Sequence, residues 1–182
     1  MEKTADRERY DPGPAREAQV RKDGDWWTLI LVRELRHSPE KVWQALTDPV
    51  HLHEWAPFQV DRNLGKSGAT VNLTWSGTTQ VSEARVTRAE APRVLEYGNM
   101  RWELDPLEGG TRLTLWHSID RRFVAWGAAG WHICFDVLER LLAGEAIGLI
   151  AGAAAMNLHG WKRLTAEYAK LFGAETPGTA KS

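Results

Sequence analysis

The segment SPEKVWQALTDPVHLHEWAP, residues 38–57, decides how this chain begins its fold. Ser38 is followed by proline and glutamate, which supply an N-cap, a proline in the first helical turn and an acid near the helix N-terminus. Asp48 and Pro49 repeat this pattern, so the first helix ends there and a second one begins. The second helix reaches only to about Trp55, because a proline follows two residues later. The segment therefore predicts two short helices in tandem.

Strand patterns lie on both sides of this segment. Residues 26–35, WWTLILVREL, are rich in β-branched and aromatic side chains and predict one long strand. Residues 58–117 alternate short runs of the same kind with turn formers such as Gly77 and Gly109, and the links are too short for crossover helices. This spacing predicts an antiparallel meander of about six strands, so we expect about seven strands in all.

The last third of the chain changes to a helical period. Residues 131–143 predict a helix with one broad apolar side that packs on a sheet. His132 and Asp136 fall on the other side, where a hydrogen-bonded pair at the surface is expected. Residues 144–156 contain three glycines spaced by four and predict an irregular connector, because each glycine costs about 1 kcal/mol relative to alanine in a helix. A second amphipathic helix follows the connector.

The two ends of the chain have a different composition. Residues 1–25 carry thirteen charged side chains, and their apolar residues have no period. This predicts a flexible charged arm at 1–25, a single domain at 26–172 and a disordered tail at 173–182.

Composition also excludes several classes of protein. The net charge is −1 and no basic run is longer than a pair, so nucleic acid is not an expected partner. No stretch resembles a signal peptide or is apolar enough to span a membrane, so no membrane partner is expected. Cys134 has no second cysteine to pair with. These features predict a cytoplasmic protein.

Motifs for cofactors, metals and common catalytic centres are missing from the sequence. It contains no glycine-rich phosphate loop, no nucleophile elbow and no paired-cysteine motif. His51 and His53 point about 200° apart on a helix, so they cannot ligate one ion there. We therefore expect no cofactor, no metal site and no dedicated catalytic residue.

The order of elements and two motifs indicate a family. Residues 37–57, HSPEKVWQALTDPVHLHEWAP, and residues 130–144, GWHICFDVLERLLAG, resemble the START-like, birch-pollen-allergen-like (SRPBCC) superfamily and its branch homologous to the activator of heat-shock protein 90 ATPase. The resemblance extends over roughly residues 26–172. It implies the α+β helix-grip fold: a curled antiparallel sheet of about seven strands, two short helices after the first strand and a long C-terminal helix across the concave face. In such folds a cavity can remain between sheet and helix, and residues 38–57 would close one end of it as a lid.

The residues expected to line this cavity are mostly apolar, and many are aromatic. Ten of the seventeen aromatic residues are tryptophans, whose large apolar faces and single N–H suit a cavity wall as well as a core. Alternation along the strands and the apolar side of the helix select the candidates. The candidate lining residues are Leu52, Trp55, Trp75, Trp102, His117, Trp131, Phe135 and Leu138.

Three functions are compatible with this reading. The first is binding of a small hydrophobic or aromatic molecule in the cavity without covalent chemistry. The second, implied by relatives that fold polyketide chains, is a cyclase- or aromatase-like enzyme in which His117 acts as acid or base. The third is a co-chaperone with a chaperone partner, although a charged segment stands here where such activators carry a separate N-terminal domain. A homodimer is a further possible assembly of this chain.

Overall fold

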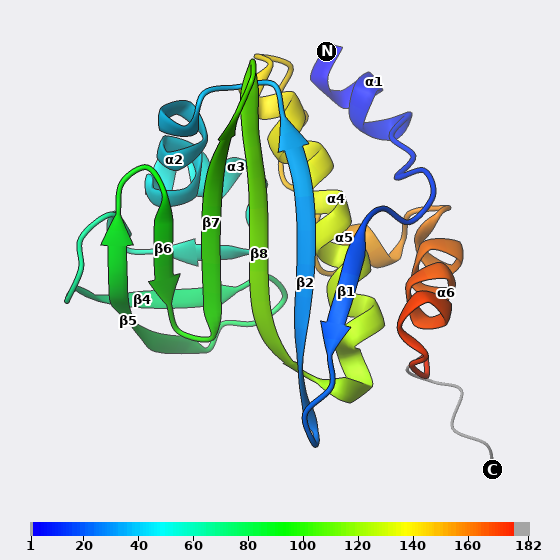
Figure 1. The fold of residues 1–182 in the computed structure, drawn as a ribbon. Helices are drawn as coiled ribbons and strands as arrows, with labels where there is room; N and C mark the ends of the chain where they lie inside the picture. The colour runs from blue at the N-terminus through cyan, green and yellow to red at the C-terminus, as the bar shows by residue number, and fades with distance from the viewer. Residues whose placement is uncertain (1, 177–182) are drawn as a thin grey trace.

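The computed structural model describes residues 2–176 and contains one curled antiparallel sheet that grips a long helix (Figure 1). The strand order is β1-β2-β8-β7-β6-β5-β4-β3, in which all neighbours are antiparallel. The strands are β1 (Ala18–Arg21), β2 (Trp26–Leu35), β3 (Phe58–Val60), β4 (Thr70–Trp75), β5 (Val81–Glu90), β6 (Val94–Tyr97), β7 (Met100–Leu107) and β8 (Gly110–Asp120). The predicted helix-grip fold and its six-strand meander are confirmed.

The tandem helices are confirmed where the sequence predicted them. Helix α2 (Pro39–Thr47) begins after Ser38, whose side chain accepts a hydrogen bond from the backbone N–H of Lys41. Helix α3 (Pro49–Trp55) begins after Asp48, whose carboxylate accepts from the N–H of Val50. Each cap replaces a hydrogen bond that the first helical turn cannot make internally, which is commonly worth about 1 kcal/mol.

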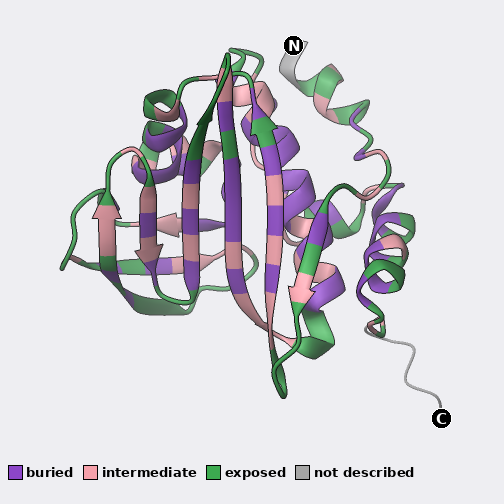
Figure 2. Cartoon of the chain, in the orientation of Figure 1, coloured by how far each residue is buried: buried purple, intermediate pink, exposed green. Residues whose placement is uncertain are grey.

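Helix α4 (Val124–Leu142) is the long helix of the fold and is buried on both sides (Figure 2). One side packs on the concave face of the sheet, and α6 (Trp161–Phe172) packs on the helix from the other side. A connector that contains the short helix α5 (Ala153–Met156) joins the two. The prediction that His132 and Asp136 lie at the surface was wrong, because their side of α4 is covered: the two residues are 0% and 9% exposed.

The N-terminal segment differs from the flexible arm that the sequence predicted. It contains helix α1 (Glu2–Glu8), the buried ring of Tyr10 and strand β1, which pairs with β2 from Ala18↔Leu31 to Arg21↔Thr28. Strand β1 is also why the sheet has eight strands where about seven were expected. The contacts that order this segment are with distant parts of the chain, so its own sequence shows no period.

At the other end of the chain, Gly173 ends α6 in a left-handed conformation with φ 62°, which glycine adopts without strain. The predicted disordered tail spans 173–182, and its residues from 177 onward lie outside the described part of the chain.

Candidate ligand-binding site

The sequence-predicted lining residues divide into two groups. Trp55, Trp102, Trp131 and Phe135 pack edge-on or tilted against one another, and the ring centroids of Trp102 and Trp131 are 5.4 Å apart. Their polar edges are mostly satisfied inside the protein: the indole of Trp55, for example, donates to the carbonyl oxygen of Ala45 at 2.9 Å. These rings fill the space beneath the tandem helices, and such ring pairs add about 0.5–1.5 kcal/mol each beyond area burial.

Leu52 and Leu138 are also fully buried, so six of the eight candidates lie in the packed core and not among the residues lining the main cavity. Residues 38–57 therefore anchor this part of the core, where a lid over a cavity was expected. Trp75 and His117 are the two candidates that do line the cavity.

That cavity has a volume of about 590 Å³ and lies where β8 ends and α4 begins. The sheet contributes the ends of β4 and β8 and the first residue of β2, while α4 contributes its first half. The connector around α5 and the first residue of α6 form the remaining side. Its main apolar and aromatic lining residues are Trp26, Trp75, Ile119, Phe123, Trp126, Cys134, Ala155, Met156 and Trp161.

His117 is the buried polar group of this cavity. Its ring stacks on Trp75 with an interplanar angle of 3° and a centroid distance of 5.6 Å. The indole N–H of Trp131 donates to His117 Nδ1 at 3.0 Å, so in the neutral ring Nε2 carries the proton. Burial lowers the pKa of His117 to about 4, which makes the neutral ring the form present near pH 7. Its Nε2–H has no hydrogen-bond partner among residues 2–176.

Charge is nearly absent from the cavity wall. Asp120 is the one charged residue among the described lining residues, and its carboxylate pairs with the guanidinium of Arg122 at 2.7 Å. The hydrogen bonds from the Arg122 side chain and backbone lower the pKa of Asp120 to about 2. Burial raises the pKa of the Cys134 thiol, so this side chain lines the wall as a neutral group. The cavity therefore offers a largely apolar surface that includes five tryptophan and phenylalanine rings.

The rim of the cavity exposes large apolar side chains to solvent. Trp26, Phe123 and Met156 are 58%, 44% and 46% exposed. The other large apolar side chains that are exposed in the described part of the chain are scattered over the surface. The connector on this side has left-handed glycines at Gly148 and Gly152, with φ of 81° and 56°. The sequence predicted the connector as irregular but gave no signal that it would line a cavity.

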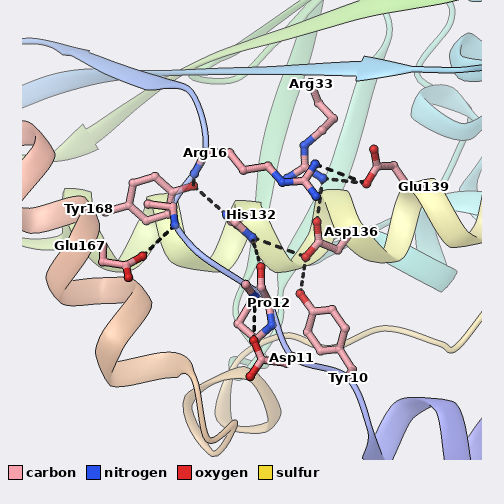
Figure 3. Close-up of polar contacts among 12 residues, drawn as sticks. Tyr10, Asp11, Pro12, Arg16, Arg33, His132, Asp136, Glu139, Glu167 and Tyr168 are labelled. Carbon is pink, nitrogen blue, oxygen red and sulfur yellow. Dashed lines mark hydrogen bonds and ion pairs between the residues drawn. The ribbon is translucent and has the colours of Figure 1, made fainter.

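A second polar cluster lies where the inward-facing side chain of Arg33 in β2 meets α4 and the N-terminal segment (Figure 3). Tyr10 donates to Asp136 at 2.6 Å, and Arg33 donates to the other oxygen of Asp136 at 2.7 Å and to Glu139 at 2.9 Å. Burial alone would raise the pKa of Asp136, but hydrogen bonds from His132 and Tyr10 and the positive charge of Arg33 outweigh it, and the pKa is lowered.

His132 joins this cluster to the N-terminal segment and to α6. Its Nε2 lies 2.6 Å from the carbonyl oxygen of Pro12, and its Nδ1 lies 2.8 Å from the hydroxyl of Tyr168 (Figure 3). Since the carbonyl only accepts, Nε2 carries a proton. The Tyr168 hydroxyl also accepts from the backbone N–H of Arg16. The hydrogen bonds of this cluster fasten the N-terminal segment to α4 and α6.

Among residues 2–176, no group of three or more histidine, cysteine, aspartate or glutamate side chains is arranged to hold a metal ion. No helix between residues 2 and 176 has the length and apolar character needed to cross a membrane.

The curled antiparallel sheet, the tandem helices after β2 and the helix across the concave face define a helix-grip protein of the START-like (SRPBCC) superfamily. More specifically, residues 36–143, more than half of the chain, match the model of the family described as "Activator of Hsp90 ATPase homolog 1-like protein", and the chain belongs to this family. Ligand-binding and cyclase-like functions are the functions that this family and fold support.

Solved structures show the same fold. The solution structure of CalU16 from Micromonospora echinospora is 20% identical, with a TM-score of 0.64 over 88% of this chain and 94% of CalU16. Its crystal structure gives 19% identity and a TM-score of 0.62. Protein MLL2253 from Mesorhizobium loti is 26% identical, with a TM-score of 0.56 over 64% of this chain and 97% of that protein. A search of curated proteins finds no match.

Proposed function

We propose that this protein binds a small, uncharged, hydrophobic or aromatic ligand in the cavity at the end of β8 and does no covalent chemistry on it. The observation that carries the proposal is a space of about 590 Å³ whose wall is mostly apolar, includes five tryptophan and phenylalanine rings, and has one charged residue among its described members, already paired with Arg122. A space of this size is within the range of small-molecule sites, which are mainly apolar with a few placed polar groups. The exposed aromatic rim offers further contact area at the mouth.

The enzymatic alternative, a cyclase- or aromatase-like reaction with His117 as acid or base, has less support. A general base works best when its pKa is near the working pH, whereas burial lowers the pKa of His117 to about 4. The one carboxylate in the wall, Asp120, is paired with Arg122 and has a pKa of about 2. These groups suit recognition better than proton transfer. A polyketide-like probe whose mass or spectrum changes on incubation with the protein would favour the enzyme instead.

Native mass spectrometry of the purified full-length protein tests the binding function. We expect a reproducible adduct that is lost on denaturation, and its fragmentation should identify an uncharged aromatic or lipophilic molecule. Equilibrium dialysis against fluorene, a planar aromatic hydrocarbon, provides a second readout for protein that loses its ligand during purification. Absence of an adduct together with absence of fluorene binding would contradict the proposal.

A variant that fills the cavity supplies the control. Gly130 lines the cavity, and a Cβ at this position would have no neighbouring heavy atom within 4 Å. Gly130→Leu should therefore place its side chain in the free space and lower fluorene affinity at least tenfold. Ala166→Leu adds the same kind of side chain on the exposed face of α6, remote from the lining residues, and should bind as the wild type does.

A further inference from the structure

Four ring N–H groups of the cavity wall are donors without an acceptor in the described part of the protein. The Nε2–H of His117 and the indole N–H groups of Trp75, Trp126 and Trp161 have no acceptor among residues 2–176. All four residues line the cavity. Each of these nitrogens retains some accessible surface, because the fully buried side-chain atoms that lack a partner do not include them. A ligand that enters the cavity therefore meets N–H groups in need of acceptors.

The donor at His117 is fixed in position by two neighbours. Trp131 occupies Nδ1 with its own N–H at 3.0 Å, which leaves Nε2 as the protonated nitrogen. The parallel ring of Trp75, 5.6 Å away, keeps the imidazole plane in one orientation. This donor favours ligands that carry an acceptor, because a ligand without one leaves the N–H without a hydrogen bond in an apolar site.

The same wall disfavours charged ligands. An anion moved from water into an apolar site needs a cation or several donors to offset its desolvation, and no Lys or Arg side chain is among the described lining residues. A cation would meet one carboxylate, that of Asp120, which Arg122 already neutralises, and ring faces whose cation–π attraction only partly offsets the lost hydration. The remaining class is an uncharged ring system that carries an acceptor oxygen.

We infer that the ligand class is an uncharged planar aromatic ketone or related carbonyl compound, whose oxygen accepts a hydrogen bond from His117 Nε2–H. This inference rests on the proposed binding function and specifies it further: His117 is the residue that determines specificity, and Trp131 positions it. The ring system of the ligand lies among Trp75, Trp126 and Trp161.

Matched probes test the inference on the wild-type protein. 9-Fluorenone and fluorene have the same ring frame and differ in a C=O in place of a CH₂, and fluorene-9-carboxylate adds a negative charge. Equilibrium dialysis should give a Kd for 9-fluorenone about threefold to tenfold below that for fluorene, the range expected for one net hydrogen bond. Fluorene-9-carboxylate should bind more weakly than both. Equal affinity for 9-fluorenone and fluorene would overturn the inference but leave the binding function standing, whereas binding of neither probe, together with no adduct in native mass spectrometry, would overturn both.

Two variants and one spectrum assign the preference to His117. In His117→Phe, the ratio of the Kd for fluorene to the Kd for 9-fluorenone should fall to one or below. His117→Gln retains both an acceptor for Trp131 and a donor for the ligand, so it should keep most of the preference for 9-fluorenone. If His117→Phe does not fold, ¹⁵N NMR of the wild-type imidazole decides. Nε2 should be protonated in the free protein and shift with 9-fluorenone but not with fluorene. A preference unchanged in folded His117→Phe, or an Nε2 signal indifferent to 9-fluorenone, would contradict the role of His117.

Discussion

At the scale of single residues, burial of His117 couples its protonation to folding. Its folded pKa of about 4 lies below the unfolded value of 6.5, so between these values the unfolded chain binds more protons. The free energy of unfolding is therefore highest above about pH 6.5 and falls as the pH decreases toward 4.

Urea unfolding of wild type and His117→Gln at several pH values measures this contribution. The wild type should lose on the order of 3 kcal/mol more than the variant between about pH 7 and pH 4. Taking the difference between the two proteins removes the effect of other groups, including His37, whose pKa burial also lowers. Parallel pH curves for both proteins would show that His117 is not buried in its neutral form.

Two glycines of α4 provide a second test at this scale. A Cβ at Gly130 would meet no heavy atom within 4 Å, whereas a Cβ at Gly127 would lie 2.6 Å from the Cδ1 atom of Ile119. Gly130→Ala should raise the free energy of unfolding by about 1 kcal/mol through helix propensity. Gly127→Ala should gain less or destabilise, since the Ile119 side chain must move. Equal stabilisation in urea titrations would show that the cavity side of α4 is packed differently.

At the scale of elements, the N-terminal segment is fastened to α4 by side chains rather than by apolar area alone. Tyr10 donates its hydroxyl proton to Asp136, 126 positions away, in a buried site. Tyr10→Phe removes the hydroxyl donor, so one carboxylate oxygen of Asp136 loses this hydrogen bond. The substitution should lower the free energy of unfolding by about 1–3 kcal/mol. Hydrogen exchange should become faster in β1 and in the backbone near Arg16.

Tyr97→Phe is the matched control for this element. Its hydroxyl is buried too, but it accepts from the indole of Trp102 in the core. This variant should lower stability without selective exchange in β1. Identical exchange patterns in the two variants would mean that Tyr10 does not fasten the N-terminal segment.

At the scale of the whole molecule, binding and stability are linked through the cavity. A ligand that binds only the folded state, present at 100 times its Kd, stabilises that state by about 2.7 kcal/mol. 9-Fluorenone at that concentration should therefore raise the Tm of the wild type and, if its Kd is at least tenfold higher in Gly130→Leu, should shift the Tm of this variant by no more than about half as much. A Tm shift of the same size in Gly130→Leu would place the bound probe outside the cavity at Gly130.

Sequence alone determined the elements whose signals are local. The caps at Ser38 and Asp48 fixed the tandem helices, and alternation with short turns fixed the meander, because hydrogen bonds and turn geometry there join near neighbours. The helix-grip fold and the family followed from the same residues.

Tertiary structure alone decided where side chains meet across the fold. Strand β1 forms only because β2 offers an open edge, and His132 and Asp136 are buried because the N-terminal segment, more than a hundred positions away, and α6 cover them. The cavity wall likewise joins chain segments from Trp26 to Trp161. A periodic pattern predicts which face of an element is buried, but packing of the whole chain determines which partner covers that face. In this protein, side chains fill the space beneath the tandem helices, where a cavity was expected, and the free space lies beside His117.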